Sequence, residues 1–427
     1  PRADKIDEGF SSKGYKTLGV SIKEGKGPWK FVGILPMFDP PRFDTAQTIQ
    51  NLIDAGINVK MITGDHLNIA KETARMIKMG QNIHPGESTR DGAQSTAELI
   101  HDSDGFAQVL PRDKREVVLT LKNKYNLIVG MTGDGVNDAP ALSAAQCGIA
   151  VDDATDAAKN AAAIILTSPG LSAIYYGVVE SRRIFRKLKS YVVYRFAASI
   201  QIVIVLSIYI FASDCPIDSL KVILLALLND LTLLPIAYDY QQASVAPEGN
   251  SVLPILGMAA FLGGVQVVSS LVFAYGLLKA QRLWQDDYDI HVCDGNTRSL
   301  LWVQMVCSAE LLIFSARAPS YIWDSIGPHP ALIVSVSMGI IIVVIIASAT
   351  SYFGGPGKLQ VGDMFGTVLY SFIVLFITDF LKVFFIGFLG IKNDVIDDKK
   401  LEMQKRNADL EANRVSTVLA ADPVSTL

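Results

Sequence analysis

The chain contains 427 residues, of which 50% are hydrophobic, and it carries a formal net charge of −4 at pH 7. The length gives room for two or three domains, and a hydrophobic content this high indicates a membrane protein. The small net charge gives no electrostatic reason to expect a nucleic acid partner, and the four cysteines have neither metal-ligand spacing nor a disulfide framework.

Residues 1–34 contain two candidate strands, at 14–22 and 29–35, separated by a turn rich in Gly and Lys. Two strands are too few for a domain, so we expect them to be the end of a domain that begins upstream. The chain also opens at Pro1, without an initiator Met or a signal peptide. These features predict that the sequence is a piece of a longer protein.

Residues 35–173 alternate predicted strands with amphipathic helices. Paired prolines at 40 and 41 break regular structure first, as at a hinge between domains. The pattern then predicts helices at 45–56, 66–79, 96–101 and from Pro111, and strands at 59–65, 126–130, 147–151 and 163–166. Alternation at this spacing indicates a parallel, doubly wound sheet of the Rossmann type.

From residue 174 to 390 the sequence is first helical and basic and then strongly apolar. Five basic residues between 182 and 189 precede the first apolar run, which predicts one long helix that passes from water into lipid. Six runs near the ~20 residues needed to cross a bilayer follow, at 191–212, 219–237, 252–279, 299–317, 331–353 and 363–390. The segment 391–427 is again Lys-rich at its start, so we expect a cytoplasmic tail and a cytoplasmic α/β domain.

The most informative stretch is Met131–Leu142, with the sequence MTGDGVNDAPAL after a predicted strand. It leaves the carboxylates of Asp134 and Asp138 at the carboxyl end of that strand, where open parallel sheets build their sites. Mg²⁺ prefers hard oxygen ligands and usually takes one or two carboxylates together with phosphate and water. An Asp-Gly turn is the alternative interpretation, but the composition of the whole stretch favours a magnesium and phosphate corner.

Two further residues have chemistry that fits this corner. Thr63 follows a predicted strand, and its hydroxyl and main-chain donors suit phosphate oxygens; Lys114, near a helix start, suits the charge on a transferring phosphoryl group. Taken singly, each is more often a surface residue. Together with Asp134 and Asp138 they resemble three of the four signatures of the haloacid-dehalogenase phosphotransferase fold. The predicted fold is therefore a haloacid-dehalogenase-like α/β domain followed by an α-helical bundle of six transmembrane spans.

The order of these motifs, with the spans that follow, resembles the second half of a P-type ATPase. The motifs are Asp39-Pro40-Pro41-Arg42, Met61-Ile62-Thr63-Gly64-Asp65, Pro111 with Lys114, and Met131–Leu142. The resemblance covers the chain to about residue 390 and implies ATP and Mg²⁺ as cofactors. It implies that residues 1–34 are the remnant of a nucleotide-binding domain and that residues 35–173 are a phosphorylation domain.

The same resemblance implies a role for each matching residue. Asp134 would hold Mg²⁺ and Asp138 would support that site, while Thr63 and Lys114 would contact the phosphoryl group. Asp39, Arg42 and Asp65 would lie near the nucleotide hinge. The family's phosphorylated aspartate lies in an Asp-Lys-Thr-Gly-Thr segment that these 427 residues do not contain. We therefore expect that the missing N-terminal half is a partner and that the fragment alone does not hydrolyse ATP.

Polar residues inside the spans are the candidates for ion transport, because they are costly in lipid. The first span contains Arg195 and Gln201, and the second contains Asn229 and Asp230 before the helix-breaking Pro235. Calcium needs 6–8 oxygen ligands, more than this set offers, whereas one carboxylate suffices for H⁺. Asp230 is the predicted proton carrier, because burial favours the protonated form and a nearby arginine favours release.

Glu310 in the fourth span is a candidate second relay. Pairing with Arg317 or Lys189 near the helix ends is an equally good interpretation of this glutamate. Asp379 and Lys382, three residues apart in the last span, are predicted to form a structural ion pair.

Within the P-type family, residues 189–195 and 236–239 resemble the fungal plasma-membrane proton pumps, and Asn229-Asp230 resembles the plant ones. The first-span arginine of the plant pumps falls where this chain has Gln201, nearly two turns from Arg195. The resemblance implies an ATP-driven H⁺ exporter of the plasma membrane, with an aspartyl-phosphate intermediate and with ATP, H⁺ and membrane lipid as partners, and it is compatible with a homo-oligomer. The alternatives are a pump for Na⁺, K⁺ or Ca²⁺, or a truncated, non-catalytic membrane protein.

Overall fold

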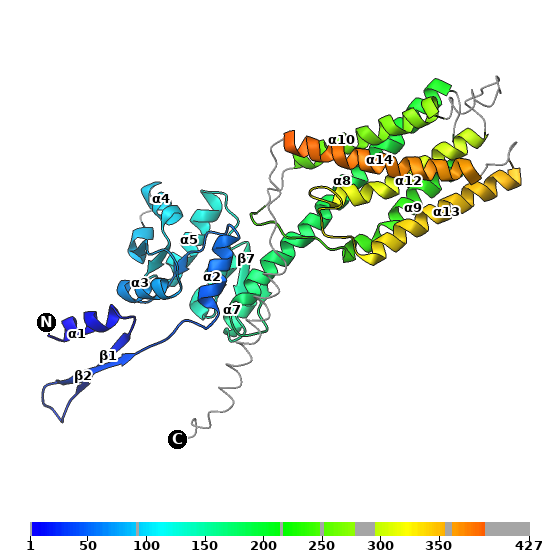
Figure 1. Cartoon of the computed structure of the whole chain (residues 1–427). Helices are drawn as coiled ribbons and strands as arrows, with labels where there is room; N and C mark the ends of the chain where they lie inside the picture. The colour runs from blue at the N-terminus through cyan, green and yellow to red at the C-terminus, as the bar shows by residue number, and fades with distance from the viewer. Residues whose placement is uncertain are drawn as a thin grey trace, which may run out of the picture. The chain divides into compact units, whose positions relative to one another are not determined.

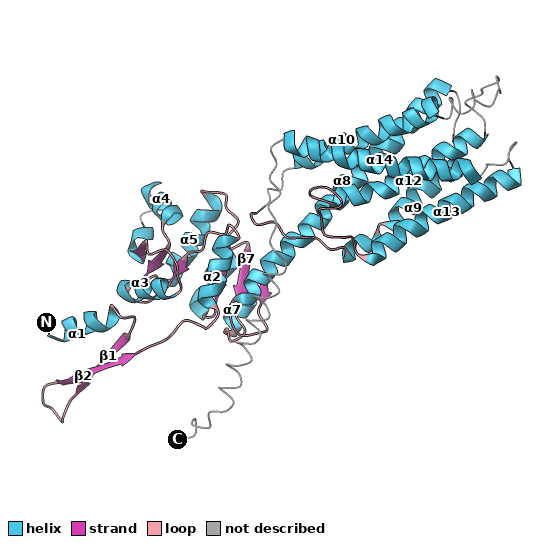
Figure 2. Ribbon diagram, viewed as in Figure 1, coloured by secondary structure: helices cyan, strands magenta, loops and turns pink. Residues whose placement is uncertain are grey.

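The structure, a computed structural model, describes residues 2–90, 94–213, 217–247, 252–277, 295–354 and 361–388. Contacts divide the chain after Val179 into an α/β unit and a helical unit, each of which is described by itself (Figures 1 and 2). The predicted tail at 391–427 lies outside the described residues.

The α/β unit begins with helix α1 (Arg2–Ser11) and an antiparallel hairpin of β1 (Lys16–Ile22) and β2 (Lys30–Met37). Both hairpin strands were predicted from the sequence; α1 was not. Large apolar side chains of the hairpin remain exposed, including Phe31 at 57% and Trp29 at 69%. The hairpin therefore does not build a core of its own, as expected for two strands alone.

The rest of the α/β unit alternates strands and helices as predicted, but in two sheets rather than one continuous sheet. One has the strand order β3-β5-β4 and the other β6-β7-β8, and both are parallel. The elements are α2 (Thr45–Asp54), β3 (Met61–Ile62), α3 (Leu67–Met76), β4 (Ile83–Pro85), α4 (Gln94–Asp102), β5 (Gly105–Ala107), α5 (Pro111–Asn123), β6 (Gly130–Gly133), α6 (Ala139–Ala144), β7 (Cys147–Ala150), α7 (Asp156–Ala161) and β8 (Ile164–Ile165).

The strand predicted at 126–130 was misplaced by about three residues. Pairing with β7 begins at Gly130, opposite Cys147, and continues to Gly133. The residues before it are not in the sheet: Asn126 has a φ of 52°, and Ile128 is 84% exposed. The paired strand therefore includes Met131 and Thr132, so the loop that carries the carboxylates begins later than the apolar run suggested.

The two sheets share part of one core. Ile62 of β3 and Val129, just before β6, pack against the same buried cluster, which includes Phe106 and Val117. β3 and β6 are each the first strand of their sheet, and within the described residues no strand pairs with the outer side of either. Their outer edges are thus unpaired, although neighbouring side chains meet in one core.

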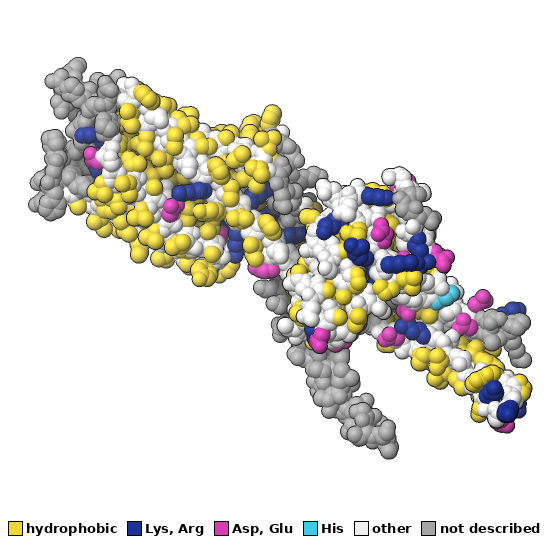
Figure 3. Space-filling model, turned by 180° about the vertical axis from the view of Figure 1, so that it is seen from behind, with side chains coloured by type: hydrophobic (Ala, Val, Ile, Leu, Met, Phe, Trp, Pro, Cys, Tyr) yellow, Lys and Arg dark blue, Asp and Glu magenta, His cyan; other side chains and the backbone are white. Residues whose placement is uncertain are grey.

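Among its described residues, the helical unit contains six helices that are long and apolar enough to cross a membrane, as the sequence predicted. They are α8 (Ser172–Ser213), α9 (Ser219–Thr232) with the 3₁₀ turn η3 (Leu234–Tyr238), α10 (Val252–Leu271) with the π-helical η4 (Val272–Leu277), α12 (Gly295–Arg317), α13 (Pro330–Gly354) and α14 (Val361–Phe388). Figure 3 shows hydrophobic side chains over most of one face of this bundle, as expected for a surface in contact with lipid.

Helix α12 is the most buried of the six, with 89% of its apolar 18-residue stretch buried inside the bundle. It runs parallel to α9, and three polar pairs join the two segments. Lys221 Nζ donates to Ser299 Oγ at 2.9 Å, and Thr232 Oγ1 donates to Glu310 Oε1 at 2.7 Å. Arg317 Nε, at the end of α12, donates to Asp239 Oδ2 at 2.5 Å, and Asp239 lies just beyond α9. All three pairs have a separation of 78 residues, so α9 and α12 keep one register over three turns.

Two buried ion pairs order the segment that follows α12. The predicted pair is confirmed, with Lys382 Nζ 2.8 Å from Asp379 Oδ1. Lys382 also donates to the carbonyl oxygens of Ser315, Ala318 and Ser320. Arg317 pairs with Asp239, whose other oxygen accepts the backbone N–H of His329 at 3.0 Å. Both carboxylates are fully buried and are satisfied by several donors each.

Removal of the Asp239 side chain tests this role. We expect Asp239→Ala to destabilise the protein by about 3–5 kcal/mol, because Arg317 would keep a buried charge without its partner. Thermal unfolding of the detergent-solubilised protein measures the effect. Asp324→Asn, an exposed carboxylate in the segment after α12, is the control and should unfold at the wild-type temperature. Equal melting temperatures for Asp239→Ala and wild type would contradict the assignment.

Candidate functional site

The loop after β6 is folded around the Asp138 carboxylate. Asp138 Oδ2 accepts the backbone N–H groups of Asp134 and Gly135, each at 3.3 Å. Gly133 packs so closely that a Cβ at this position would lie 2.6 Å from Asp138 Cβ. Only glycine fits there, so the first glycine of Gly-Asp-Gly is a requirement of this compact turn.

Lys114 reaches this loop from helix α5. Its Nζ lies 2.7 Å from Asp138 Oδ1, and both side chains are largely buried. Asp113, next to it, accepts the N–H of Leu110 at 2.9 Å and so caps the start of α5. Arg90 donates to the same carboxylate at 2.9 Å. The structure therefore brings Lys114 and Asp138 together, as the sequence predicted for one corner, and fixes the helix start that positions the lysine.

Asp134 differs from Asp138 in its surroundings. Its side chain is exposed, and its carboxylate has no hydrogen bond or ion pair within the described part of the chain. Its backbone carbonyl is held by Thr155, which donates its N–H at 2.8 Å and its hydroxyl at 3.1 Å. An exposed carboxylate on a fixed backbone fits a direct Mg²⁺ ligand, while Asp138, already bound by Lys114 and two N–H groups, fits a supporting role.

Arg42 lies with two acidic residues that the sequence analysis missed. Its Nη2 is 2.9 Å from Asp153 Oδ1, and its Nη1 is 3.8 Å from Asp152 Oδ1. The hydrogen bond to Asp153 raises the pKa of Arg42 and lowers the pKa of Asp153. Both aspartates follow β7, so an acidic pair directly after a predicted strand was the available signal. No hydrogen bond or ion pair in the described chain joins Arg42 to Asp39 or Asp65.

Asp39 and Asp65 instead share a lysine. Lys16 Nζ is 3.1 Å from Asp65 Oδ1 and 3.8 Å from Asp39 Oδ2. Thr63 Oγ1 accepts the N–H of Asp65 at 3.1 Å, which fixes the turn after β3. Lys16 lies on β1, far away in sequence, and no local pattern marked it. The predicted residues thus form three groups: Thr63 with Asp65 and Asp39, Lys114 with Asp138 and Asp134, and Arg42 with Asp152 and Asp153.

In the helical unit, the structure brings Arg195 of α8 and Asp230 of α9 into an ion pair. A second bond of the pair, from Arg195 Nη2 to Asp230 Oδ2, is 3.3 Å long. Both side chains are partly exposed, at 37% and 52%. Because charged groups in a membrane face protein or water rather than hydrocarbon, this face of the bundle requires a covering segment or a water-filled path.

The interior of the bundle contains amide groups with hydrogen-bonding atoms that have no partner in the described structure. Asn229 is fully buried, and neither its Nδ2 nor its Oδ1 has a partner in the described structure. Gln201 donates to Ser270 Oγ at 3.0 Å and to Ser308 Oγ at 2.8 Å, and its Oε1 is without a partner among these residues. Such atoms are costly in a dry interior, so they mark a place where water or an ion would be stabilised.

Glu310 is buried, at 1% exposure. The Thr232 hydroxyl lies 2.7 Å from its Oε1 and 2.6 Å from its Oε2. The alternative interpretation, a pairing with Arg317, was wrong, because Arg317 is bound to Asp239. The described contacts of Glu310 do not include Lys189 either. Glu310 is therefore a buried carboxylate whose partner is a neutral hydroxyl on α9, one turn from Asn229.

The cap of α5 yields a prediction about acid stability. Burial raises the pKa of Asp113, but the hydrogen bonds from Arg90 and the Leu110 N–H outweigh it and leave that pKa lowered. A lowered carboxylate pKa stabilises the fold above the unfolded value of about 3.9, and this contribution is lost as the pH falls through the folded pKa. We expect Arg90→Ala to raise the midpoint pH of acid unfolding, measured by circular dichroism.

The matched control is Arg112→Ala, which removes the more distant, 71% exposed arginine at 3.6 Å from the same carboxylate. It should leave the midpoint near that of wild type. An acid midpoint that moves equally in both variants would show that net charge, rather than the cap, is responsible.

Comparison with known proteins adds the following findings. Residues 11–146 match the family of haloacid dehalogenase-like hydrolases. The chain is 35% identical over 402 residues to a protein of Dictyostelium discoideum named as a plasma membrane ATPase, and the match covers 92% of this chain and 34% of that protein. It is 35% identical over 407 residues to a protein of Methanocaldococcus jannaschii named as a cation-transporting ATPase, covering 91% of this chain and 48% of that protein.

The chain thus spans between a third and a half of the length of these two relatives. The matches extend over the α/β unit and the membrane helices alike, since they cover nine-tenths of the chain. The described chain therefore has a haloacid-dehalogenase-like α/β domain followed by six helices long and apolar enough to cross a membrane, and over nine-tenths of its length the chain is similar to proteins named as plasma membrane and cation-transporting ATPases.

Proposed function

We propose that the chain is part of a P-type ATPase that exports H⁺ across the plasma membrane through an aspartyl-phosphate intermediate. The observation that carries the proposal is the ion pair of Arg195 and Asp230 within two candidate spans. The relative named as a plasma membrane ATPase supports the location. The basic stretch of α8 supports a cytoplasmic α/β domain.

In this proposal the α/β domain binds and transfers phosphate. Lys114 stabilises the charge of the phosphoryl group, and the Thr63 hydroxyl and nearby N–H groups orient its oxygens. Asp138 holds Lys114 at 2.7 Å, so the lysine is in place before phosphate arrives. Mg²⁺ bound through Asp134 would neutralise phosphate charge. We expect the phosphorylated aspartate to come from sequence outside these 427 residues, so that this fragment does not hydrolyse ATP by itself.

Asp230 carries the proton. When Asp230 is protonated it has no charge and releases Arg195; when it is ionised the arginine pairs with it and discourages rebinding of the proton. Asn229, the neighbour of Asp230 in the chain, has unpartnered buried amide atoms among the described residues, and so does Gln201 on the same helix as Arg195. Such atoms suit ordered water. A metal cation at Asp230 would have to displace an arginine already bound there, so the pair favours H⁺ over a metal ion.

Helix α8 is the proposed connection between phosphate chemistry and Asp230. Its residues up to Val179 group with the α/β unit and those from Glu180 with the helical unit. The buried carboxylate of Asp44 accepts two backbone N–H groups, from Leu171 at 2.6 Å and from Ser172 at 2.8 Å. Ser172 is the first residue of α8. Arg195 lies further along the same helix. A conformational change around Asp44 would therefore move α8, the helix that carries Arg195, the partner of Asp230.

A pump for another cation is the second candidate, favoured by the relative named as a cation-transporting ATPase and by the buried Glu310 carboxylate. In that case Glu310, the Thr232 hydroxyl and the free amide oxygens of Asn229 and Gln201 would supply oxygen ligands to the ion. The two candidates differ in a measurable way. ATP turnover by a Na⁺, K⁺ or Ca²⁺ pump is stimulated by that cation, whereas a proton pump acidifies with Mg²⁺ as the only added metal.

The decisive test uses the full-length protein in sealed vesicles. We expect Asp230→Asn to abolish ATP-driven proton uptake while phosphoenzyme still forms, because the amide cannot release a proton. A pH-sensitive dye measures uptake, and acid-quenched labelling measures phosphoenzyme. Asp218→Asn, the same substitution at the start of α9 outside the pair, is the control. Normal uptake by the Asp230 variant would exclude this residue as the carrier, and uptake that depends on Na⁺, K⁺ or Ca²⁺ would favour the second candidate.

The magnesium assignment has its own test. We expect Asp138→Asn to raise the Mg²⁺ concentration needed for phosphoenzyme formation by about 10–100-fold, the usual effect of losing a supporting residue, and Asp134→Asn to raise it further. Asp156→Asn, an exposed aspartate at the start of α7, should have no effect. A Mg²⁺ dependence unchanged in Asp134→Asn would exclude Asp134 as the direct ligand.

A further inference from the structure

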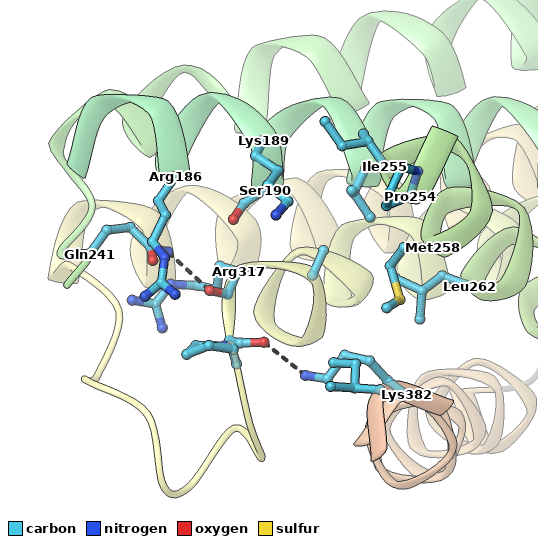
Figure 4. Close-up of a pocket in the computed structure, with 15 residues that line it drawn as sticks. Arg186, Lys189, Ser190, Gln241, Pro254, Ile255, Met258, Leu262, Arg317 and Lys382 are labelled. Carbon is cyan, nitrogen blue, oxygen red and sulfur yellow. Dashed lines mark hydrogen bonds between the residues drawn. The ribbon is translucent and has the colours of Figure 1, made fainter. Parts of the chain in front are cut away.

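The segment between α12 and α13, residues 318–329, is not helical, although it joins two candidate spans. Buried charged side chains bind its backbone. Lys382 donates to the carbonyl oxygen of Ala318 at 3.1 Å, and Arg317 donates to that of Ile326 at 2.9 Å. Figure 4 labels both cations at the start of this segment, and the dashed line from Lys382 marks its bond to Ala318. Irregular backbone that is satisfied by protein in this way is tolerated at membrane depth.

The depth of this segment follows from Asp379 of α14. The N–H of Ile322 donates to Asp379 Oδ2 at 2.9 Å, so the turn at Ile322 lies at the level of this carboxylate. Asp379 is nine residues before Phe388, the last residue of α14, which corresponds to about 14 Å along the helix. The candidate span of α14 has 27 residues, or about 40 Å, close to the thickness of a bilayer with its headgroups. The turn therefore lies below the outer edge of the headgroup region.

This turn presents two aromatic rings. Tyr321 and Trp323 are stacked, with ring centroids 4.7 Å apart and planes 7° apart, and Trp323 is 61% exposed. An indole that is exposed to water loses its apolar contacts, whereas an indole at headgroup level contacts the acyl chains and keeps its N–H hydrated. The next residue, Asp324, is also exposed, and its charge fits the headgroup region and not the hydrocarbon.

A second group of aromatic side chains lies at the same end of the bundle. The ring of His329, at the end of the same segment, is 5.0 Å from that of Tyr240 and 6.4 Å from that of Tyr238, and both tyrosines are exposed. Arg317 donates to the carbonyl oxygen of Tyr240 at 2.8 Å, so the end of α12 connects the two groups. Exposed aromatic side chains gathered at one end of membrane helices are typical of an interfacial belt.

We propose that residues 318–329 anchor the bundle in the membrane interface, with the Trp323 ring inserted where the lipid headgroups meet the acyl chains. The partner is the lipid surface of the bilayer that the spans cross. The segment contains no Lys or Arg, so the contact does not depend on anionic lipid, and phosphatidylcholine is a sufficient surface. The inference requires only that the helices span a membrane and is independent of the transported ion.

The test measures how lipid reaches Trp323, by tryptophan fluorescence of the full-length protein in phosphatidylcholine vesicles. The difference between wild type and Trp323→Phe isolates the signal of this ring. We expect lipid brominated in the upper part of its acyl chains to quench this signal about twofold more than lipid brominated near the chain ends, because an interfacial ring lies at headgroup level. Trp29→Phe, the same substitution at an exposed tryptophan of the α/β unit, is the control and should leave quenching by both lipids unchanged.

Iodide, a quencher that stays in water, separates lipid contact from the other surroundings of the ring. It should quench the Trp323 signal only weakly. The proposal is overturned if iodide quenches this signal as strongly as that of free tryptophan, because the segment would then face water. It is also overturned if neither iodide nor brominated lipid quenches it, because protein would then cover the ring, or if both brominated lipids quench it equally. Thermal unfolding of Trp323→Phe confirms that the variant is folded.

Discussion

The burial of helix α12 is the constraint on which the helical unit depends. A helix surrounded by other helices in a membrane has no water for its polar side chains, so partners on neighbouring helices stabilise them. The partners of Ser299, Glu310 and Arg317 all lie 78 residues earlier, which fixes α9 beside α12 in one parallel register. Ser308 accepts a hydrogen bond from Gln201 of α8, and Ser315 donates one to Asp379 of α14. The polar groups of one helix thus determine where three others pack.

The α/β unit differs from the helical unit. Two of its strands, β3 and β6, each have one edge that no other described strand pairs with. Parallel sheets are normally covered on both faces. Here the strands form two separate sheets, and β3 and β6 each begin one of them. Ile62 and Val129 nevertheless share one buried cluster. The residues proposed to contact phosphate follow these two strands, Thr63 after β3 and Asp134 after β6. The division between the sheets therefore separates the two groups of candidate residues, which explains why contacts join Lys114 to Asp138 but none in the described chain joins Thr63 to either.

The sequence predicted features that depend on local pattern and missed those that depend on distant partners. Apolar runs near twenty residues placed all six spans, and Pro235 correctly ended the helical part of the second. Strands of two to four residues were harder: β4 and β5 were not predicted, and β6 was displaced because the apolar run before it is exposed. At the candidate site, motif and spacing predicted that Asp134, Asp138 and Lys114 lie at one corner, and the structure brings them together. Lys16 was not predicted, because its partners Asp39 and Asp65 are distant in sequence and long-range pairing leaves no periodic signal. Asp152 and Asp153 had a local signal, the acidic pair after a predicted strand, but their partner Arg42 is also distant in sequence.

Three ion pairs of the bundle, Arg317–Asp239, Lys382–Asp379 and Arg195–Asp230, separate structural from functional candidates. Asp239 and Asp379 are fully buried, and each accepts a backbone N–H as well as its cation, from His329 and Ile322. Removing either carboxylate would leave several buried donors without an acceptor, so these two carboxylates fit a structural role. The Asp230 side chain is half exposed, and the described chain offers its carboxylate no donor but Arg195. Loss of its charge would break one pair and leave no buried donor unsatisfied. The proton carrier proposed above needs that freedom, and Asp230 is the one of the three carboxylates that has it.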